Sequence, residues 1–404
     1  MELGPIWRAL MRNKTSYVLI ALQIAVTMAI MVNAINIIQE RSAQMSRSSG
    51  VDEENIFYLR SNIFDPEADF EAQLAADLDA IRNFPGVRNA IYSNSVPLSG
   101  GGWSEGVRLE PDPDLDSTGV AVFFADEHGI DTFGLNLIAG RNFDPAEVTW
   151  HDYETDAWPP TTIMTRAMVE ELFPDEPIEN ALGKTVYVHQ TKPVQIIGIT
   201  ERMQAAWNSW SGVERSMLVP EWRARANVRY VIRAESGRRD EVMPQVEEML
   251  ATMTDNRIIR GVDTMEQTRR ESYLLDSSMI RILTFIVIVL TAITGLGIVG
   301  LASFSVARRT KQIGTRRALG ATRPAIMRYF MLENFLISTV GVLGGAVIAI
   351  AINMWMVDAF GLQRIAWYLI PAAMGTLWLV GQLAVYGPAR RATMVPPALA
   401  TRSV

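Results

Sequence analysis

The chain of 404 residues contains no cysteine and only three histidines. Without cysteine it has no disulfide bond, no thiolate metal site and no thiol nucleophile. The histidines, His128, His151 and His189, are scattered and do not share the spacing of a metal site. No nucleophile with a paired base stands out. An enzyme is therefore the class of protein that the sequence favours least.

A phosphate-binding loop is also missing, because the sequence contains no G-x-x-x-x-G-K-[ST] motif. Gly183, Lys184 and Thr185 match the end of that motif, but the glycine five residues earlier is absent. We expect these residues to form a turn that enters a strand. We expect no cofactor on this chain.

The composition indicates a mixture of membrane and soluble parts. Hydrophobic residues make up 49% of the chain, and the mean hydropathy is +0.12. Four long apolar runs are each close to the 20 residues that a transmembrane helix needs. We predict transmembrane helices at 17–38, 279–306, 334–357 and 365–388. The first run is too long for a signal peptide and precedes no cleavage motif, so we expect it to remain as an anchor.

Basic residues near the ends of these runs predict the orientation of the chain. They gather in three segments, 1–16, 307–333 and 389–404, which we predict to be cytoplasmic. The basic residues are Arg8, Arg12, Lys14, Arg308, Arg309, Lys311, Arg316, Arg317, Arg323, Arg328, Arg390, Arg391 and Arg402. Segment 39–278 then lies outside. Acids outnumber bases there almost two to one, which disfavours nucleic acid as a partner.

The external segment has a mixed α and β pattern. A strand at 55–60, an amphipathic helix at 67–84 and a strand at 87–96 form one β-α-β unit. The same order returns with a strand at 228–234, a helix at 239–253 and a strand at 257–262. We therefore predict one α+β domain that is interrupted by an insertion at about residues 102–225. The clearest strands of this β-rich insertion are 120–124, 185–188 and 194–200.

Two kinds of residue cluster within the insertion. The acidic clusters lack the glycine and the distal glutamate of a calcium loop, so we expect solvated loops. They are Asp112, Asp114 and Asp116, and Asp152, Glu154 and Asp156. Five tryptophans either line a groove for a partner or pack in the core, and the sequence leaves both roles open. They are Trp103, Trp150, Trp158, Trp207 and Trp210.

The external domain joins the second span through 261–279, where Met265, Tyr273 and Leu274 have helical spacing. The polar segment 40–49 after the first span could also be helical. We expect membrane helices that continue outward and form a rigid stalk.

The basic loop between the second and third spans has the signals of two helices. The first helix covers 308–319, Gly320 ends it in a left-handed conformation, and Thr322 caps the next helix with Pro324 in its first turn. Anionic lipid could explain the basic residues alone, but it does not require this break. We favour a docking surface made of Arg308, Arg309, Ile313, Arg316, Arg317, Leu319, Gly320 and Ala321.

Other residues of the membrane runs have structural roles. Glu333 lies where the third span enters the membrane, so we expect it to pair with Arg308, Arg309 or Arg328. Small-residue faces that include Gly295, Gly341 and Gly345 predict close packing of helices.

These segments together resemble the FtsX-like permeases of ABC transporters. Residues 307–314 and 316–322 resemble the family's signature, 331–333 resemble its entry to the third span, and 386–392 with 397–399 resemble its C-terminal motif. The order of one span, a large external domain and three further spans is similar to the MacB-type branch. Residues 139–143 and 182–186 resemble the periplasmic domain of that branch.

The resemblance implies a bundle of four transmembrane helices and a large α+β periplasmic domain in a bacterial inner membrane. Because no ATPase motif is present, it also implies a separate cytoplasmic ABC ATPase dimer that binds ATP. A second permease subunit, identical or not, is implied, with membrane lipids around it. A periplasmic adaptor and an outer-membrane channel are further partners that the branch suggests.

The function that the resemblance favours is export of an antibiotic, peptide or lipid-like substrate by mechanotransmission, without a channel through the bilayer. ATPase closure would push on the basic loop, and the second span would carry the motion outward. Two alternatives remain at this point. One is a regulatory transducer that controls a periplasmic enzyme, and the other is a permease that extracts lipoproteins.

Overall fold

A computed structural model of the chain describes residues 14–65, 67–151, 157–189, 191–223 and 226–396. The cluster of Asp152, Glu154 and Asp156, the basic residues Arg8, Arg12 and Arg402, and the motif residues 397–399 lie outside these ranges. The chain divides into two compact units. We call residues 1–45 and 275–404 the helical unit, and residues 46–274 the α+β domain.

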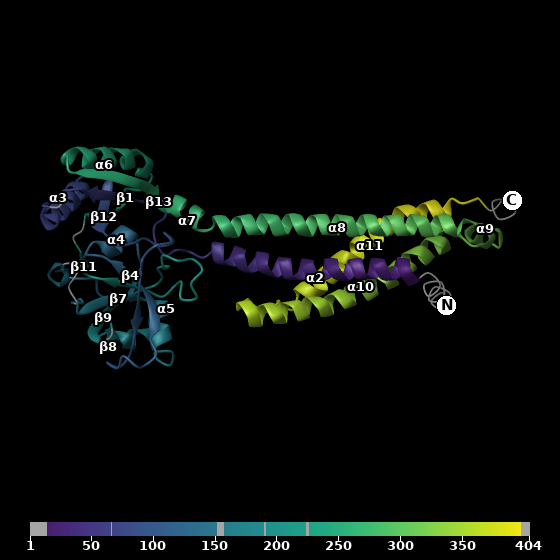
Figure 1. Ribbon diagram of the computed structural model, residues 1–404, viewed down its shortest axis with the longest axis horizontal. Coiled ribbons are helices and arrows are strands. Elements are labelled where there is room, and N and C mark those ends of the chain that lie inside the picture. Colours follow the sequence, from purple (N-terminus) through teal and green to yellow (C-terminus); the bar gives the residue numbers. More distant parts are fainter. Residues whose placement is uncertain (1–13, 66, 152–156, 190, 224–225, 397–404) are drawn as a thin grey trace. The chain divides into compact units, whose positions relative to one another are not determined.

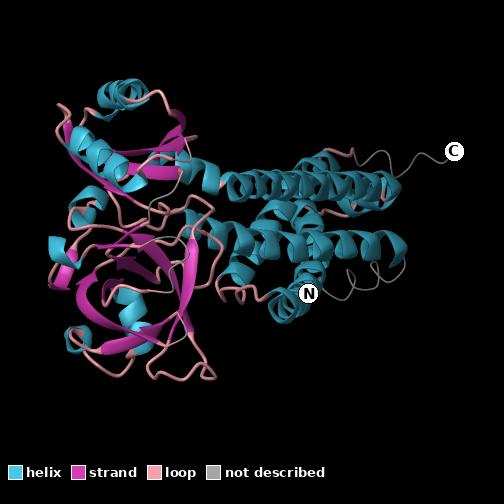
Figure 2. Cartoon of the chain, turned by 60° about the vertical axis from the view of Figure 1, so that its left-hand side comes forward, coloured by secondary structure: helices cyan, strands magenta, loops and turns pink. Residues whose placement is uncertain are grey.

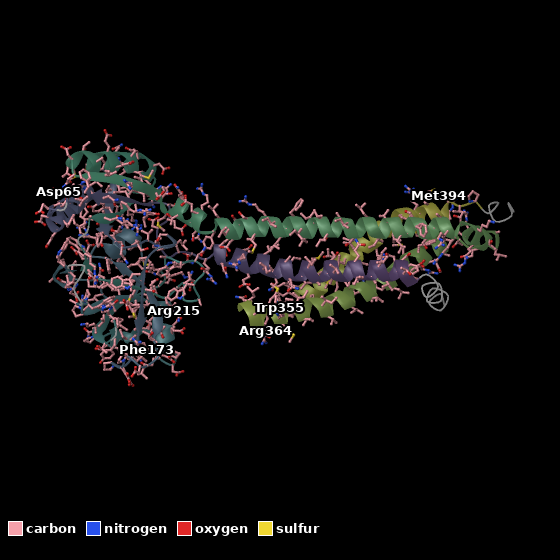
Figure 3. The ribbon with its side chains drawn as sticks, viewed as in Figure 1. Asp65, Phe173, Arg215, Trp355, Arg364 and Met394 are labelled. Carbon is pink, nitrogen blue, oxygen red and sulfur yellow. The ribbon has the colours of Figure 1, made fainter. Side chains whose placement is uncertain are left out.

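The helical unit contains the four predicted membrane helices. Within the described residues, four helices are long and apolar enough to cross a membrane. They are α2 (Lys14–Met45), α8 (Leu274–Arg308), α10 (Arg323–Phe360) and α11 (Leu369–Thr393). Figure 3 labels Trp355 and Arg364 at one end of this unit and Met394 at the other. Trp355 is exposed, as expected for an aromatic side chain at a membrane interface.

Helix α10 packs closely on α2 because two glycines of α10 face it. A Cβ atom at Gly345 would lie 2.5 Å from the Cβ of Met28, and one at Gly341 would lie 2.7 Å from the Cβ of Ile24. Gly295 of α8 differs, since a Cβ there would meet Val380 at an ordinary 3.6 Å. The predicted small-residue contact is therefore tight in the third span and loose at Gly295.

The packing of the membrane helices is unequal. The apolar window of α2 is 56% buried, whereas that of α8 is 11% buried. Helix α2 thus forms the centre of the described bundle, and α8 presents most of its apolar surface outward. Thr27 of α2 and Thr294 of α8 share a buried hydrogen bond of 2.8 Å.

The α+β domain contains a four-stranded sheet that unites the two predicted β-α-β units. Its elements are β1 (Ile56–Ile63), α3 (Phe70–Arg82), β2 (Val87–Tyr92), β12 (Asn227–Ala234), α6 (Arg239–Met253) and β13 (Arg257–Thr264). The strand order is β13-β1-β12-β2, and all neighbours are antiparallel. Each unit therefore inserts one strand between the strands of the other, which is the split β-α-β arrangement of ferredoxin-like folds.

Both helices cover the same face of this sheet (Figure 2). Leu74 and Leu78 of α3 and Val246 of α6 pack with Phe57 and Tyr230 of the strands. An ion pair of 2.6 Å between Arg257 and Asp77 is fully buried beneath α3. Tyr230 donates a hydrogen bond to the same carboxylate, and burial raises the pKa of its hydroxyl well above the ordinary value. One polar cluster thus joins α3, β12 and β13.

The insertion forms a second sheet of seven strands. They are β3 (Trp103–Val107), β4 (Thr118–Phe124), β5 (Leu137–Gly140), β7 (Thr161–Thr165), β8 (Thr185–Val188), β9 (Lys192–Thr200) and β10 (Ser216–Val219). The order is β3-β4-β10-β7-β9-β5, with β8 also on β9. Arg108 after β3 bridges to Tyr187 of β8, so the sheet curls upon itself (Figure 2). The short pair β6 (Thr149–Trp150) and β11 (Glu221–Trp222) lies apart from it.

Short helices complete the insertion. They are α4 (Gly129–Phe133) and α5 (Arg166–Leu172). Charged contacts join α4 to the four-stranded sheet, because Asp131 pairs with Arg88 of β2 at 2.8 Å and with Arg233 of β12 at 3.4 Å. Burial opposes the ionisation of Asp131, but hydrogen bonds from Arg88 and Asn89 outweigh it and lower its pKa.

The predicted stalk needs a correction. Strand β13 extends to Thr264, α7 (Met265–Ser272) follows, and α8 begins at Leu274. Tyr273 separates α7 from α8. Its N–H donates to the carbonyl of Arg269 and so makes the last hydrogen bond of α7. Met265 and Tyr273 are buried, so apolar packing explains their helical spacing. Helix α2 continues past the apolar run to Met45, as the polar segment after the first span suggested.

The contact of α10 with α2 leads to a test. We expect Gly345→Leu to force α10 away from α2, since even a Cβ atom would collide with Met28, and to lower the free energy of unfolding by about 1–3 kcal/mol. Gly344→Leu is the matched control, because a Cβ there has its nearest neighbour at 4.0 Å. Thermal unfolding in detergent would measure both variants, and equal effects would contradict the assignment.

Candidate functional site

The segment between α8 and α10 folds as the basic loop predicts, with a short helix and a sharp break. Helix α9 (Thr310–Ala318) follows Arg309 directly. Gly320 has a φ of 95°, and the N–H groups of Gly320 and Ala321 donate to the carbonyls of Arg317 and Arg316. This pair of bonds is a Schellman motif, which ends a helix at a left-handed residue. The Thr322 side chain then caps α10 at Ala325, and Pro324 lies in the first turn.

One face of α9 is fixed to the helices around it. Ile313 is 5% exposed and packs with Ile326 and Phe330 of α10 and with Ala389 and Ala392 of α11. The sequence placed Ile313 on a docking face together with Arg316, Arg317 and Gly320. The structure corrects this, because Ile313 supports α9 from the inside. Helical periodicity gave the spacing of these residues but not the direction of the apolar side chain.

The outer face of α9 is basic and apolar at once. We give this name to four exposed residues: Arg308 at the end of α8, Arg316 of α9, and Leu319 and Gly320 directly after α9, with Leu319 84% exposed. The guanidinium of Arg316 lies 5.0 Å from the centroid of the Tyr329 ring, which holds its direction. Arginine is enriched in protein interfaces, so an exposed face that carries arginines beside an apolar side chain fits a contact surface for a partner.

Arg317 and Arg309, two further members of the predicted docking set, bind inside the unit. Arg317 donates to the carbonyls of Thr393 and Val395 at 3.1 and 2.7 Å, so it holds the end of α11. Arg309 bonds both oxygens of Glu333 at 3.1 Å. Of the three arginines proposed as partners of Glu333, the structure selects Arg309.

A buried network surrounds this ion pair. Glu333 is 4% exposed, and its Oε1 also accepts a hydrogen bond of 2.8 Å from the hydroxyl of Tyr17. Arg309 donates to the same hydroxyl at 2.8 Å. The three side chains come from α10, from the junction of α8 and α9, and from α2. The network therefore ties α9 to the central helix of the bundle. Sequence reasoning missed Tyr17, which lies at the start of the first apolar run.

A small cavity of about 30 Å³ adjoins the network, with Tyr17, Ser305, Glu333 and Asn334 in its wall. The side-chain nitrogen of Asn334 and the hydroxyl of Ser338 are buried without a protein partner. A cavity of this size has room for one water molecule, although most of its wall is apolar. It is far smaller than a path for a drug-sized substrate would need.

The insertion holds the other residues that the sequence singled out. The five tryptophans are partly buried and pack edge to face, with ring centroids 5.6 Å apart for Trp103 and Trp158 and 6.3 Å apart for Trp207 and Trp210. Asp112, Asp114 and Asp116 lie in an exposed loop, as expected. Gly183 has a φ of 79° and precedes β8, which confirms the predicted turn. Among the described residues, no group of three potential ligands could hold a metal ion.

Figure 3 labels two partly buried residues of the insertion, Phe173 and Arg215. The Lys184 ammonium lies 4.2 Å from the centroid of the Phe173 ring, and Arg215 lies over the ring of Trp210. These cation–π contacts support packing roles for the side chains involved.

The ion pair leads to a test of what holds α9. We expect Glu333→Ala to leave the cation of Arg309 buried without a carboxylate and to lower the free energy of unfolding by about 3 kcal/mol. Removing the cation as well, in Glu333→Ala with Arg309→Met, should restore most of the loss. Arg308→Ala is the control, since Arg308 is exposed. Thermal unfolding in detergent would measure all three, and a control as unstable as Glu333→Ala would refute the role of the pair.

Comparison with protein families gives two matches that together cover most of the chain. The model of the FtsX-like permease C-terminal domain matches residues 284–397. The model of the MacB-like periplasmic core domain matches residues 18–249, which is more than half of the chain. These two matches contain most of α8, all of α9 to α11 and most of the α+β domain.

Curated relatives agree with the family models. The macrolide export ATP-binding/permease protein MacB of Shewanella oneidensis is 24% identical over 336 residues, 80% of this chain and 48% of that protein. The protein of the same name from Campylobacter jejuni is 26% identical over 251 residues, 56% of this chain and 36% of that protein. The chain thus spans half or less of the length of these relatives.

Among solved structures, the periplasmic region of MacB from Actinobacillus actinomycetemcomitans aligns with a TM-score of 0.32 and 12% identity, over 57% of this chain and 97% of that one. This likeness is too weak to carry an argument, and the assignment depends on the family models. The chain belongs to the FtsX-like permeases of ABC transporters, in the branch that carries a MacB-like periplasmic core domain.

Proposed function

We propose that this chain is a permease subunit that couples ATP hydrolysis by a cytoplasmic ATPase to movement of its periplasmic domain and so to export of a substrate. The observation that carries the proposal is the outer face of α9. Arg308, Arg316 and Leu319 are exposed there, while Ile313 and Arg309 hold the helix firmly from inside. A partner that pushes on α9 would therefore move the helices to which it is fixed.

Helix α8 is the element that we propose carries this movement. It runs without interruption for 35 residues, which corresponds to about 52 Å. The hydrocarbon core of a membrane is only about 30 Å thick, so the helix extends beyond it. Outside the apolar run, Asp276 of α8 pairs with Arg41 of α2 at 2.9 Å. The pair joins the two helices that lead into the periplasmic domain.

The rest of the assembly follows from the same proposal. The basic end of the helical unit, with both termini, would face the cytoplasm of a bacterial inner membrane. ATP would be bound by a separate ATPase dimer. The unburied apolar face of α8 supports a second permease subunit beside it. The Shewanella relative bears the name of a macrolide exporter, which supports export, and a periplasmic adaptor with an outer-membrane channel would complete the path.

The docking surface leads to a specific test. We expect Arg316→Glu with Leu319→Asp to weaken binding of the ATPase by about tenfold or more, because an arginine of the proposed interface is reversed in charge and a second acid replaces the exposed leucine beside it. Arg390→Glu is the matched control, since Arg390 is an exposed basic residue outside α9. The tagged chain would be purified from membranes of its host, and the ABC ATPase that co-purifies would be quantified by mass spectrometry. An unchanged yield with the double variant would refute docking at α9.

A second test concerns transmission along α8. We expect Leu275→Gly with Met279→Gly to leave ATP hydrolysis intact but to reduce export, because each glycine costs about 1 kcal/mol of helix stability and softens the helix. Both positions are exposed. Leu275→Ala with Met279→Ala removes the same side chains and keeps the helix stiff. ATPase activity and export would be measured in parallel, and equal export by both pairs would contradict the role of α8.

A further inference from the structure

A groove on the helical unit lies apart from the outer face of α9. It has a volume of about 810 Å³ and runs along the first turns of α10, and α11 contributes one residue, Gln382, to its lining. Its walls include Ala325, Arg328, Met331, Leu332 and Phe335 of α10, and Gln382 of α11. The volume lies within the range of sites that bind drug-sized molecules.

The groove is amphipathic along its length. Its lining includes one charged residue, the exposed Arg328, and no carboxylate. Phe335 lies seven residues further along α10, about 10 Å away along the helix axis. Phe335 is 40% exposed and stacks on Trp378 of α11 with ring centroids 5.6 Å apart. Met331 and Leu332 line the path between the cation and this aromatic pair.

The groove changes from polar to apolar along its length in the same order as a membrane does from headgroups to acyl chains. Helix α10 is one of the membrane-spanning candidates, and its charge-free run begins after Glu333. Phe335 therefore lies within the apolar layer, whereas Arg328 precedes that layer by one to two turns. A basic residue at this level attracts anionic headgroups, and a guanidinium binds phosphate oxygens in pairs.

We propose that this groove binds one anionic phospholipid, with the phosphate on Arg328 and an acyl chain along Met331, Leu332 and Phe335. The lipid would lie along α10, and Gln382 would be its polar neighbour on α11. Arg308, Arg316 and Leu319 do not line the groove. The proposal is therefore independent of docking by an ATPase, and its failure would leave that function untouched.

The test uses the full chain purified in detergent and native mass spectrometry with added lipid. We expect phosphatidylglycerol to bind about fivefold more tightly than phosphatidylcholine, as an interfacial basic residue favours an anionic headgroup. Arg328→Gln should remove this preference. Arg323→Gln is the matched control, because Arg323 is also exposed in the first turn of α10 but does not line the groove. Unchanged thermal unfolding of both variants would show that they are folded.

Three outcomes would overturn the proposal. An equal loss of preference in Arg323→Gln would indicate diffuse attraction to a basic surface. Competition by glycerol phosphate at the same concentration as the lipid would show that the groove binds a phosphate group and does not require acyl chains. Loss of the bound lipid when the chain is purified in complex with its ATPase would assign the groove to that protein. Retention of phosphatidylglycerol by the complex and by Arg323→Gln, but not by Arg328→Gln, would support the lipid site.

Discussion

The structure of the helical unit depends on a buried ion pair between Arg309 and Glu333, completed by the hydroxyl of Tyr17. A carboxylate at this depth is costly unless a cation and hydrogen bonds compensate it. Here the compensation comes from three different segments of the chain, so none of them can move alone without breaking the network. The short helix α9 begins directly after Arg309, the residue that supplies the cation. The position of α9 is thus fixed by the same contacts that make the bundle tolerate Glu333.

The helices around this network differ in how closely they pack on one another. The glycines of α10 bring its backbone against α2, and α11 packs on both, so these three helices form a close group. Helix α8 contacts the group less and remains largely exposed. Helix α9 is anchored to the close group at Arg309, and Arg309 directly follows the last residue of α8 in the sequence.

The sequence predicted most of this where the signal is local. The break at Gly320, the cap at Thr322 and the two β-α-β units depend on neighbouring residues, and the structure confirms them. Contacts between distant segments could not be predicted from the sequence. Tyr17 and Glu333 are separated by 316 positions, and nothing in either neighbourhood pairs them. The two β-α-β units share one sheet, and the seven-stranded sheet curls upon itself. Both features depend on pairing between distant strands, which the periodicity of the sequence does not predict. The direction of Ile313 was missed because a four-residue spacing defines a face without saying which neighbour covers it.

The contrast between α2 and α8 has a consequence for how the family can change over time. Side chains of α2 such as Met28 and Val32 are enclosed, and any change in their volume must be answered by α10. Among the described residues, only 11% of the apolar window of α8 is buried, so the residues of its outward face are less constrained by packing within the chain than those of α2. Related permeases should therefore diverge fastest on that face, keep the α2–α10 seam nearly constant, and acquire new pairing partners without redesign of the core.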